Sequence, residues 1–285
     1  MASNSIRLLI SCPDARGLIA EATTFVRDHG GNILEADQHT DPTQNRFFMR
    51  LEIDPGQFDL DQDAFARAWA PVATKFNMDW RLASGEQCKR LALLAGPQTH
   101  CVSDILYRVW SGEIDAEIAC VISNHESAGD IASSLGCSFT HLPVAPGQEA
   151  EQERAVRGVL DESGVDVVVL ARYMRVLSPE FVAAYPNRII NIHHSFLPAF
   201  VGAKPYHQAF ERGVKLIGAT SHYVTDSLDE GPIIAQQTAG VSHRDTIDDL
   251  IRKGRDLERV VLGEAVRLHV EDRVIVEGNK TVVFE

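Results

Sequence analysis

The stretch from Asn191 to Gly231 reads NIHHSFLPAFVGAKPYHQAFERGVKLIGATSHYVTDSLDEG. Its apolar start, with the two isoleucines before it, predicts a buried strand that ends in Asn191 and His193. Side chains two positions apart on a strand share a face, so we expect these two to point the same way. A second strand is expected over residues 216–224, and Asp229 follows it in a turn. An amide, an imidazole and a carboxylate are therefore expected to converge at one edge of a sheet.

These side chains suit attack on a carbonyl carbon. An amide and a protonated imidazole donate to a developing oxyanion, and a carboxylate accepts the proton of a water molecule. His222 lies on the strand that leads to Asp229, where it is placed to hold the carboxylate or the water. His194 is the weaker candidate, because neighbouring side chains on a strand face opposite ways.

Residues 1–84 predict a first domain. Apolar spacing predicts strands at 6–10, 32–38, 47–53 and 78–82 and helices at 17–29 and 64–76. The resulting βαββαβ order is the ferredoxin-like pattern. Asp14 stands where the cap of the first helix is expected.

The polar, aperiodic segment 85–89 is the expected linker, which makes 90–285 the second domain. Strands are predicted at 90–94, 116–122, 138–142 and 165–170, and helices at 102–111, 128–135, 148–162 and 246–269. This alternation predicts an α/β fold with an open, mostly parallel, Rossmann-like sheet that has helices on both faces. Ligands of such sheets bind beyond the carboxyl ends of the strands. The chain is expected to end in a hairpin within 274–284.

Composition excludes several classes of partner. The net charge of −13 argues against nucleic acid and against anionic membranes. No apolar run reaches the ~20 residues of a membrane span. The five cysteines are odd in number and have no Cys-x-x-Cys spacing, which favours reduced thiols. We therefore expect a cytoplasmic protein.

The motifs Asn-Ile-His, Ser-Phe-Leu-Pro and Leu-Asp-Glu-Gly resemble the catalytic signature of the folate-dependent formyltransferases and their hydrolytic relatives. The resemblance covers essentially the whole chain. It implies a formyltransferase-type catalytic domain, a 10-formyltetrahydrofolate substrate, and catalytic roles for Asn191, His193 and Asp229, with His222 beside them.

Residues 171–179 resemble the segment that lines the pterin pocket in this family. The resemblance implies that Met174, Val176 and Leu177 supply apolar walls. It also implies that the backbone from Arg175 to Leu177 bonds to the pterin edge. Read alone, the segment is a strand end that runs into a helix capped by Ser178.

The N-terminal motifs CPDARGLIA, GGNI and QHTD resemble the ACT domain of the formyltetrahydrofolate deformylases. This implies that the turn with Asp14, Gly17 and Leu18, with Asn32 opposite, binds an amino-acid effector, glycine or methionine being the best candidates. Some ACT modules serve mainly as dimer interfaces. A homo-oligomer, either a dimer or a tetramer, is expected in both cases.

The turn 95–101 bears on the acceptor of the formyl group. A phosphorylated acceptor needs a glycine-rich turn with free backbone N–H groups before a helix. Here Gly96 is the single glycine, and Pro97 lacks an N–H group. That departs from the glycinamide ribonucleotide transformylases, and the barrel domain and basic surface of the methionyl-tRNA formyltransferases are missing as well. Water is thus the expected acceptor.

The sequence therefore predicts a hydrolase that converts 10-formyltetrahydrofolate to tetrahydrofolate and formate. Such an enzyme balances the folate pools and supplies formate for purine synthesis, without a cofactor or metal. Three alternatives remain open. They are formyl transfer to a small amine, a zinc hydrolase that uses His193, His194, His222 and Asp229, and an amino-acid sensor with a degenerate second domain. Formate release and metal analysis separate them.

Overall fold

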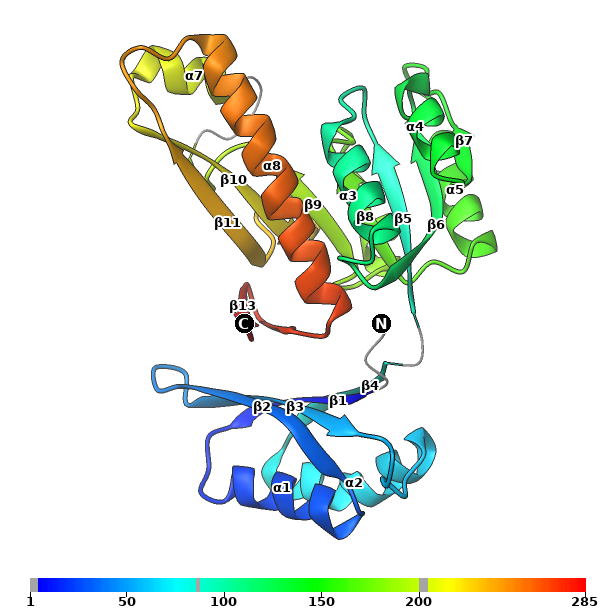
Figure 1. Ribbon diagram of the computed structural model, residues 1–285, viewed down its shortest axis with the longest axis vertical. Helices are drawn as coiled ribbons and strands as arrows, with labels where there is room; N and C mark the ends of the chain where they lie inside the picture. The colour runs from blue at the N-terminus through cyan, green and yellow to red at the C-terminus, as the bar shows by residue number, and fades with distance from the viewer. Residues whose placement is uncertain (1–4, 86–87, 200–204) are drawn as a thin grey trace. The chain divides into compact units, whose positions relative to one another are not determined.

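The computed structural model describes residues 5–85, 88–199 and 205–285 (Figure 1). The chain divides into two compact units. The first comprises residues 1–88, 271–277 and 282–285, and the second comprises 89–270 and 278–281. Residues 86 and 87 of the expected linker lie outside the described residues.

The first unit has the predicted βαββαβ order. Its elements are β1 (Ile6–Pro13), α1 (Leu18–Asp28), β2 (Asn32–Asp41), β3 (Arg46–Asp54), α2 (Gln62–Phe76) and β4 (Asp79–Ser84). The strands form an antiparallel sheet in the order β2-β3-β1-β4, with both helices on one face (Figure 1). Leu51 and Ile53 of β3 pack with Phe65 and Trp69 of α2 in a core closed to solvent.

The expected cap of α1 is wrong. Gly17 precedes the helix in the left-handed conformation, at φ 92°, and no side chain caps the helix. Glycine tolerates this conformation because it has no Cβ. Asp14 instead uses its backbone N–H to bond to the Asn45 carbonyl. Helix α2 does have a side-chain cap, since Asp61 accepts from the Ala64 N–H at 2.7 Å.

The end of the chain differs from the predicted division, because Glu271–Glu277 belong to the first unit. Arg50 alternates with the core residues of β3, so its side chain projects from the opposite face of the sheet. It is 1% exposed. Its Nη1 donates to Glu35 at 2.6 Å, its Nη2 to Glu52 at 2.8 Å and its Nε to the Asp272 carbonyl at 3.1 Å. A buried guanidinium needs this many acceptors, and the C-terminal segment supplies some of them.

Asp272 fastens that segment to the sheet. Its carboxylate is 1% exposed and accepts from Arg7 at 3.3 Å and from Arg81 at 2.5 Å. Arg7 is itself 13% exposed, so this pair is largely out of water, whereas Arg81 is half-exposed and contributes less.

Asp272→Asn is expected to lower the free energy of unfolding of the first unit by about 3 kcal/mol, because it removes the negative charge that pairs with the largely buried Arg7. Asparagine keeps the size and tolerates the left-handed backbone of this residue, at φ 54°. Urea unfolding followed by tryptophan fluorescence measures the change, since Trp69 and Trp80 both lie in this unit. Asp28→Asn, which removes an exposed pair with Arg27, should cost less than ~0.5 kcal/mol. Equal effects of the two changes would refute the assignment.

The second unit is built on a seven-stranded sheet in the order β11-β10-β9-β8-β5-β6-β7. The five strands from β9 to β7 in this order are parallel, and β10 pairs antiparallel with both β9 and β11. The elements up to β8 are β5 (Lys89–Ala95), α3 (His100–Trp110), β6 (Ala116–Ser123), η1 (Glu126–Ala128), α4 (Gly129–Ser134), β7 (Phe139–His141), α5 (Glu149–Glu162) and β8 (Val167–Ala171). Those after it are α6 (Pro179–Ala184), β9 (Ile189–His193), α7 (Pro205–Arg212), β10 (Leu216–Tyr223), β11 (Ile233–Gly240), α8 (Ile247–Val270), β12 (Val274–Glu277) and β13 (Lys280–Val283).

This confirms the predicted mostly parallel α/β sheet. Ala92 and Leu94 of β5 pack with α5 and α6, while Leu91 and Leu93, which point the other way, are equally buried. Both faces of β5 are therefore covered. Strand order reverses between β5 and β8, so their carboxyl ends open a crevice of the kind in which such sheets bind ligands. No helix in the described part of the chain is long and apolar enough to cross a membrane.

Candidate active site

The paired strands β9 and β10 bring the predicted catalytic side chains together. His222 lies directly opposite Asn191 in this antiparallel pair. Asp229 sits in the turn between β10 and β11. Its Oδ2 lies 3.2 Å from Nδ1 of His193, and its Oδ1 lies 3.6 Å from Nε2 of His222. The sequence-based expectation that these four side chains share one edge of the sheet agrees with this geometry.

Backbone contacts fix the orientation of His222. Its Nδ1 lies 2.9 Å from the Tyr223 carbonyl oxygen, which can only accept, so Nδ1 carries a proton. In the neutral ring Nε2 is then the acceptor, and Nδ2 of Asn191 donates to it at 3.2 Å. His222 therefore holds the amide of Asn191 more closely than it holds Asp229. The second N–H of that amide remains available.

The turn after β10 is unusually tight. Asp229 has the left-handed φ of 56°. A Cβ on Gly231 would overlap the Tyr223 carbonyl oxygen, the same oxygen that orients His222. Position 231 therefore has to be glycine for the site to keep its geometry.

Gly231→Ala is expected to lower kcat for the reaction proposed below by about 10²-fold, because a displacement of ~1 Å in a catalytic group has an effect of that size. Steady-state kinetics measures it. Gly240→Ala is the matched control, since a Cβ there would meet no atom within 4 Å. A Gly231→Ala variant that is as active as the Gly240→Ala variant would disprove the steric argument.

Electrostatics keeps Asp229 ionised. Close contacts with His193 and then His222 hold the pKa of this carboxyl well below its usual range, and they outweigh the opposing effect of burial. A carboxylate with so low a pKa is a weak proton acceptor. It is better suited to orient His193 and to balance a positive charge on that ring.

His193 has one reactive edge. The ring is 5% exposed, and its Nε2 is buried without a hydrogen-bond partner among the described residues. His194, also buried, packs against it with ring centroids 5.3 Å apart. Burial, and then the charge of Arg172, lower the pKa of His194 to about 4, so this second ring is neutral near pH 7.

The segment expected to contact the folate leaves β8 as an irregular loop. Met174 and Val176 are 62% and 74% exposed, which is high for apolar side chains. Leu177 packs against the core beneath the loop, and Arg175 pairs with Glu149 at 3.7 Å. Ser178 caps α6, as the sequence predicts, by accepting from the Phe181 N–H. Two exposed apolar side chains on this loop are consistent with one wall of a pocket for the flat pterin ring.

The residues expected to bind an effector are separated within one chain. Pro13, just before Asp14, pairs with the start of β3, whereas Asn32 pairs with Asp54 at its other end. The eight residues of β1 span about 24 Å at ~3.4 Å per residue. The expectation that Asn32 lies opposite the Asp14 turn is therefore wrong for a single chain, because strand register places the two at opposite ends of the sheet. Leu18 is buried in the core.

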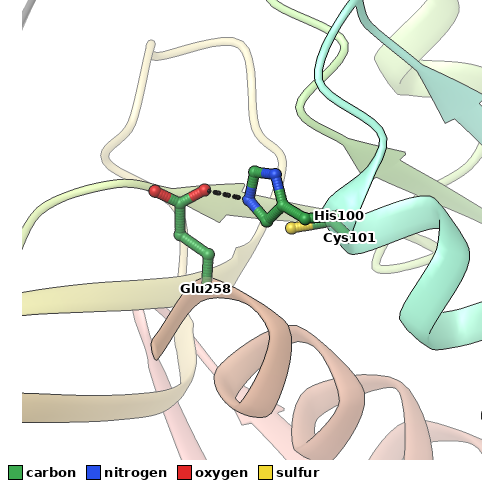
Figure 2. A group of neighbouring side chains, drawn as sticks. All are labelled: His100, Cys101 and Glu258. Carbon is green, nitrogen blue, oxygen red and sulfur yellow. Dashed lines mark hydrogen bonds and ion pairs between the residues drawn. The ribbon is translucent and has the colours of Figure 1, made fainter. Parts of the chain in front are cut away.

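Sequence analysis missed a buried cluster around Glu258 of α8 (Figure 2). Figure 2 shows the ring of His100 directed at the Glu258 carboxylate, with the Cys101 sulfur nearby. In the described part of the chain, this is the one group of His, Cys, Asp and Glu donors that all lie within 4.8 Å of one another. The four residues of the zinc alternative do not form such a group.

The donors of this cluster do not suit a metal ion. His100 already bonds to Glu258 at 2.7 Å, and the Arg172 cation lies 3.5 Å from the same carboxylate oxygen. Burial, and then the charge of Glu258, raise the pKa of the Cys101 thiol well above its usual range, so the thiol stays protonated and is a poor ligand.

Comparison with known proteins agrees with this geometry. The sequence pattern of the family described as Formyl transferase matches residues 89–266, and that of the ACT domain matches residues 6–69. The formyltetrahydrofolate deformylase of Bacillus subtilis is 50% identical over 279 residues, which are 98% of this chain and 93% of that protein. The chain belongs to the formyltetrahydrofolate deformylase family.

Solved structures match either nearly the whole of this deformylase family member or about 70% of it. The crystal structure of a formyltetrahydrofolate deformylase from Pseudomonas syringae is 48% identical, covers 99% of this chain and 94% of its own, and superposes with a TM-score of 0.96. Glycinamide ribonucleotide transformylase 1 from Symbiobacterium toebii is 36% identical with a TM-score of 0.67, over 70% of this chain and 95% of its own. The formyltransferase-type fold is therefore shared with enzymes of a different name, and the local chemistry has to distinguish them.

Proposed function

We propose that this protein hydrolyses 10-formyltetrahydrofolate to tetrahydrofolate and formate. The observation that carries the proposal is the pair formed by His193 and Asp229. The other ring nitrogen of His193, Nε2, is buried and has no hydrogen-bond partner among the described residues. Such a nitrogen can exchange a proton with a water molecule or a substrate atom next to it. The full-length similarity to deformylases supports the same reaction.

In the first step, Nε2 of His193 accepts a proton from water as the water oxygen bonds to the formyl carbon. Asp229 holds Nδ1 and balances the positive charge of the ring. The negative charge that develops on the formyl oxygen is met by the second N–H of Asn191, whose first N–H is held by His222. This moves the role of base from Asp229, the residue favoured by the sequence, to His193.

In the second step, the carbon–nitrogen bond breaks. N10 is a poor leaving group unless it is protonated, so the imidazolium of His193 returns its proton to N10 as the bond opens. Tetrahydrofolate leaves with that hydrogen, and formic acid loses a proton to solvent. The His193 ring is then neutral again and ready for the next water.

The crevice after β5 supports water as the acceptor. Gln98 accepts two hydrogen bonds from Arg172, at 2.8 Å and 3.1 Å, and His100 bonds to Glu258. A Cβ on Gly96 would overlap the Arg172 carbonyl oxygen, so the chain packs closely there. Side chains of the protein thus fill a turn that a phosphorylated acceptor would need open.

Asn191→Ala, His193→Ala and Asp229→Ala are each expected to lower the rate of formate release by about 10²–10⁴-fold, which is typical for oxyanion donors and for acid–base groups. Combined changes should be less than additive, because the three act as one unit. Formate release from 10-formyltetrahydrofolate, with and without a chelator, measures the rates. We expect no effect of the chelator, and no product with added small amines in place of formate. Near-normal turnover in one variant would remove that residue from the mechanism.

The cellular role follows from the products. We propose that the enzyme acts in the cytoplasm, adjusts the ratio of formylated to free tetrahydrofolate, and supplies formate for purine synthesis. Without control, the reaction would consume activated one-carbon units and release only formate. That consequence favours a regulatory role for the ACT domain.

We propose that an amino acid, glycine or methionine, binds at the ACT domain and changes turnover. The Asp14–Gly17 turn and Asn32 lie at opposite ends of one sheet, so a small ligand touches both only where two copies meet. Among the described residues β2 and β4 are the edge strands of this sheet, and their outer edges suit such association. Effector binding would then require the homo-oligomer, because the site forms only between two copies of the chain.

Asp14→Ala and Asn32→Ala should each blunt the response to the effector and leave basal turnover unchanged. A typical coupling is ~1–3 kcal/mol, or roughly 5–150-fold in affinity. Formate release and calorimetry at increasing glycine or methionine measure it. Arg67→Ala, at an exposed position in the middle of α2, is the control. If neither amino acid binds or changes the rate, the proposed effector role is refuted, and the ACT domain serves only in assembly.

A further inference from the structure

Glu258 is the centre of a buried network that the mechanism above does not use. The side chain lies within α8 and is 1% exposed. One oxygen accepts from the Tyr206 hydroxyl at 2.6 Å. The other accepts from His100 at 2.7 Å and lies 3.5 Å from Nε of Arg172. Three separate elements therefore converge on a single carboxylate.

The partners keep this carboxylate charged. Burial raises the pKa of Glu258, but the hydrogen bond from His100, the charge of Arg172 and the hydroxyl of Tyr206 together bring it below its usual value. Because charge-assisted hydrogen bonds are stronger than neutral ones, Tyr206 is held firmly in place.

A continuous series of contacts leads from Tyr206 to the reacting ring. The Tyr206 ring meets His194 edge-on, with centroids 6.0 Å apart at 66°. His194 in turn packs against His193, with centroids 5.3 Å apart. Gly254, one turn before Glu258 on α8, leaves the space that the Tyr206 ring occupies, since a Cβ there would overlap it.

His194 depends on this packing for its position. The ring is 8% exposed, and neither of its nitrogens bonds to another residue within the described ranges 5–85, 88–199 and 205–285. Contact with Tyr206 on one side and His193 on the other therefore sets its orientation. His193, for its part, is fixed by Asp229 at Nδ1 and by His194 at the ring face.

From this geometry we infer that Glu258 is a positioning residue for His193, acting through Tyr206 and His194. Glu258 fixes the tyrosine, the tyrosine fixes the neutral ring, and that ring limits the motion of the catalytic one. The kinetic part of this inference rests on the proposed function. Small displacements of a catalytic group lower turnover strongly, so the effect should fall on kcat.

The test uses the full chain with Glu258→Gln, Tyr206→Phe and the matched control Glu264→Gln, a partly exposed glutamate on the same helix that bonds to Gln237. We expect kcat for formate release to fall about 10-fold or more in the first two variants, with KM unchanged within about twofold, and neither to change in the control. Tyr206→Phe leaves the Glu258 bond to His100 intact, so it guards against a general failure of folding. Circular dichroism and thermal unfolding verify that each variant is folded.

Two further measurements separate positioning from a general structural role. In a His193→Ala background, Glu258→Gln should cause no further loss of the residual turnover, because its effect passes through the missing ring. Ring signals of His193 and His194 in histidine-labelled protein should shift or broaden in Glu258→Gln and Tyr206→Phe but not in Glu264→Gln. Additive losses in the double variant, or ring signals identical to wild type, would overturn the inference. A wild-type chain that releases no formate would instead refute the proposed function, and the ring signals would still decide the positioning role.

Discussion

The candidate site depends on the antiparallel register of β9 and β10. That register puts His222 opposite Asn191 and starts the turn that returns Asp229 towards His193. A shift by one residue would turn every side chain of one strand to the other face. The Tyr223 carbonyl and Gly231 then fix the fine geometry, because the oxygen that orients His222 leaves no room for a side chain at position 231. The positions of the reactive residues are therefore determined mainly by the backbone, through strand register and the tight turn at Gly231.

The sequence predicted these parts well because their signals are local. Apolar periodicity is enough to define β9, and Asn191 and His193 follow from a period of two. The order of elements in the first unit follows from helical and strand spacing in the same way. Even the cap at Ser178 is a short-range signal, since its partner lies three residues further on. The prediction failed for Asp14 as a cap, where a left-handed glycine allowed the helix to begin without one.

What the sequence could not predict is the result of long-range contact. Glu258 occurs within a charged helix, and its burial depends on distant partners such as His100, which is 158 positions away. The burial of Arg50 depends on a backbone carbonyl 222 positions further along the chain. The expectation that Asn32 faces the Asp14 turn fails because strand register places the two at opposite ends of the sheet. For Glu258 and Arg50, the free energy of a buried charge depends on partners that no local pattern contains.

The carboxylates of Asp272, Glu258 and Asp229 are all buried or half-buried, yet they have different roles. The difference lies in whether the hydrogen-bond partner of each carboxylate keeps a polar atom of its own without a partner. Asp272 is enclosed by arginines that cannot lose a proton, so it can only hold structure together. Both oxygens of Glu258 accept from donors that are themselves fixed in the fold. Asp229 alone pairs with a ring whose far nitrogen is buried and has no partner in the described chain. An imidazole can take up or release a proton there, and the paired carboxylate compensates the charge. The unsatisfied nitrogen, more than the number of charges, therefore marks where chemistry can occur.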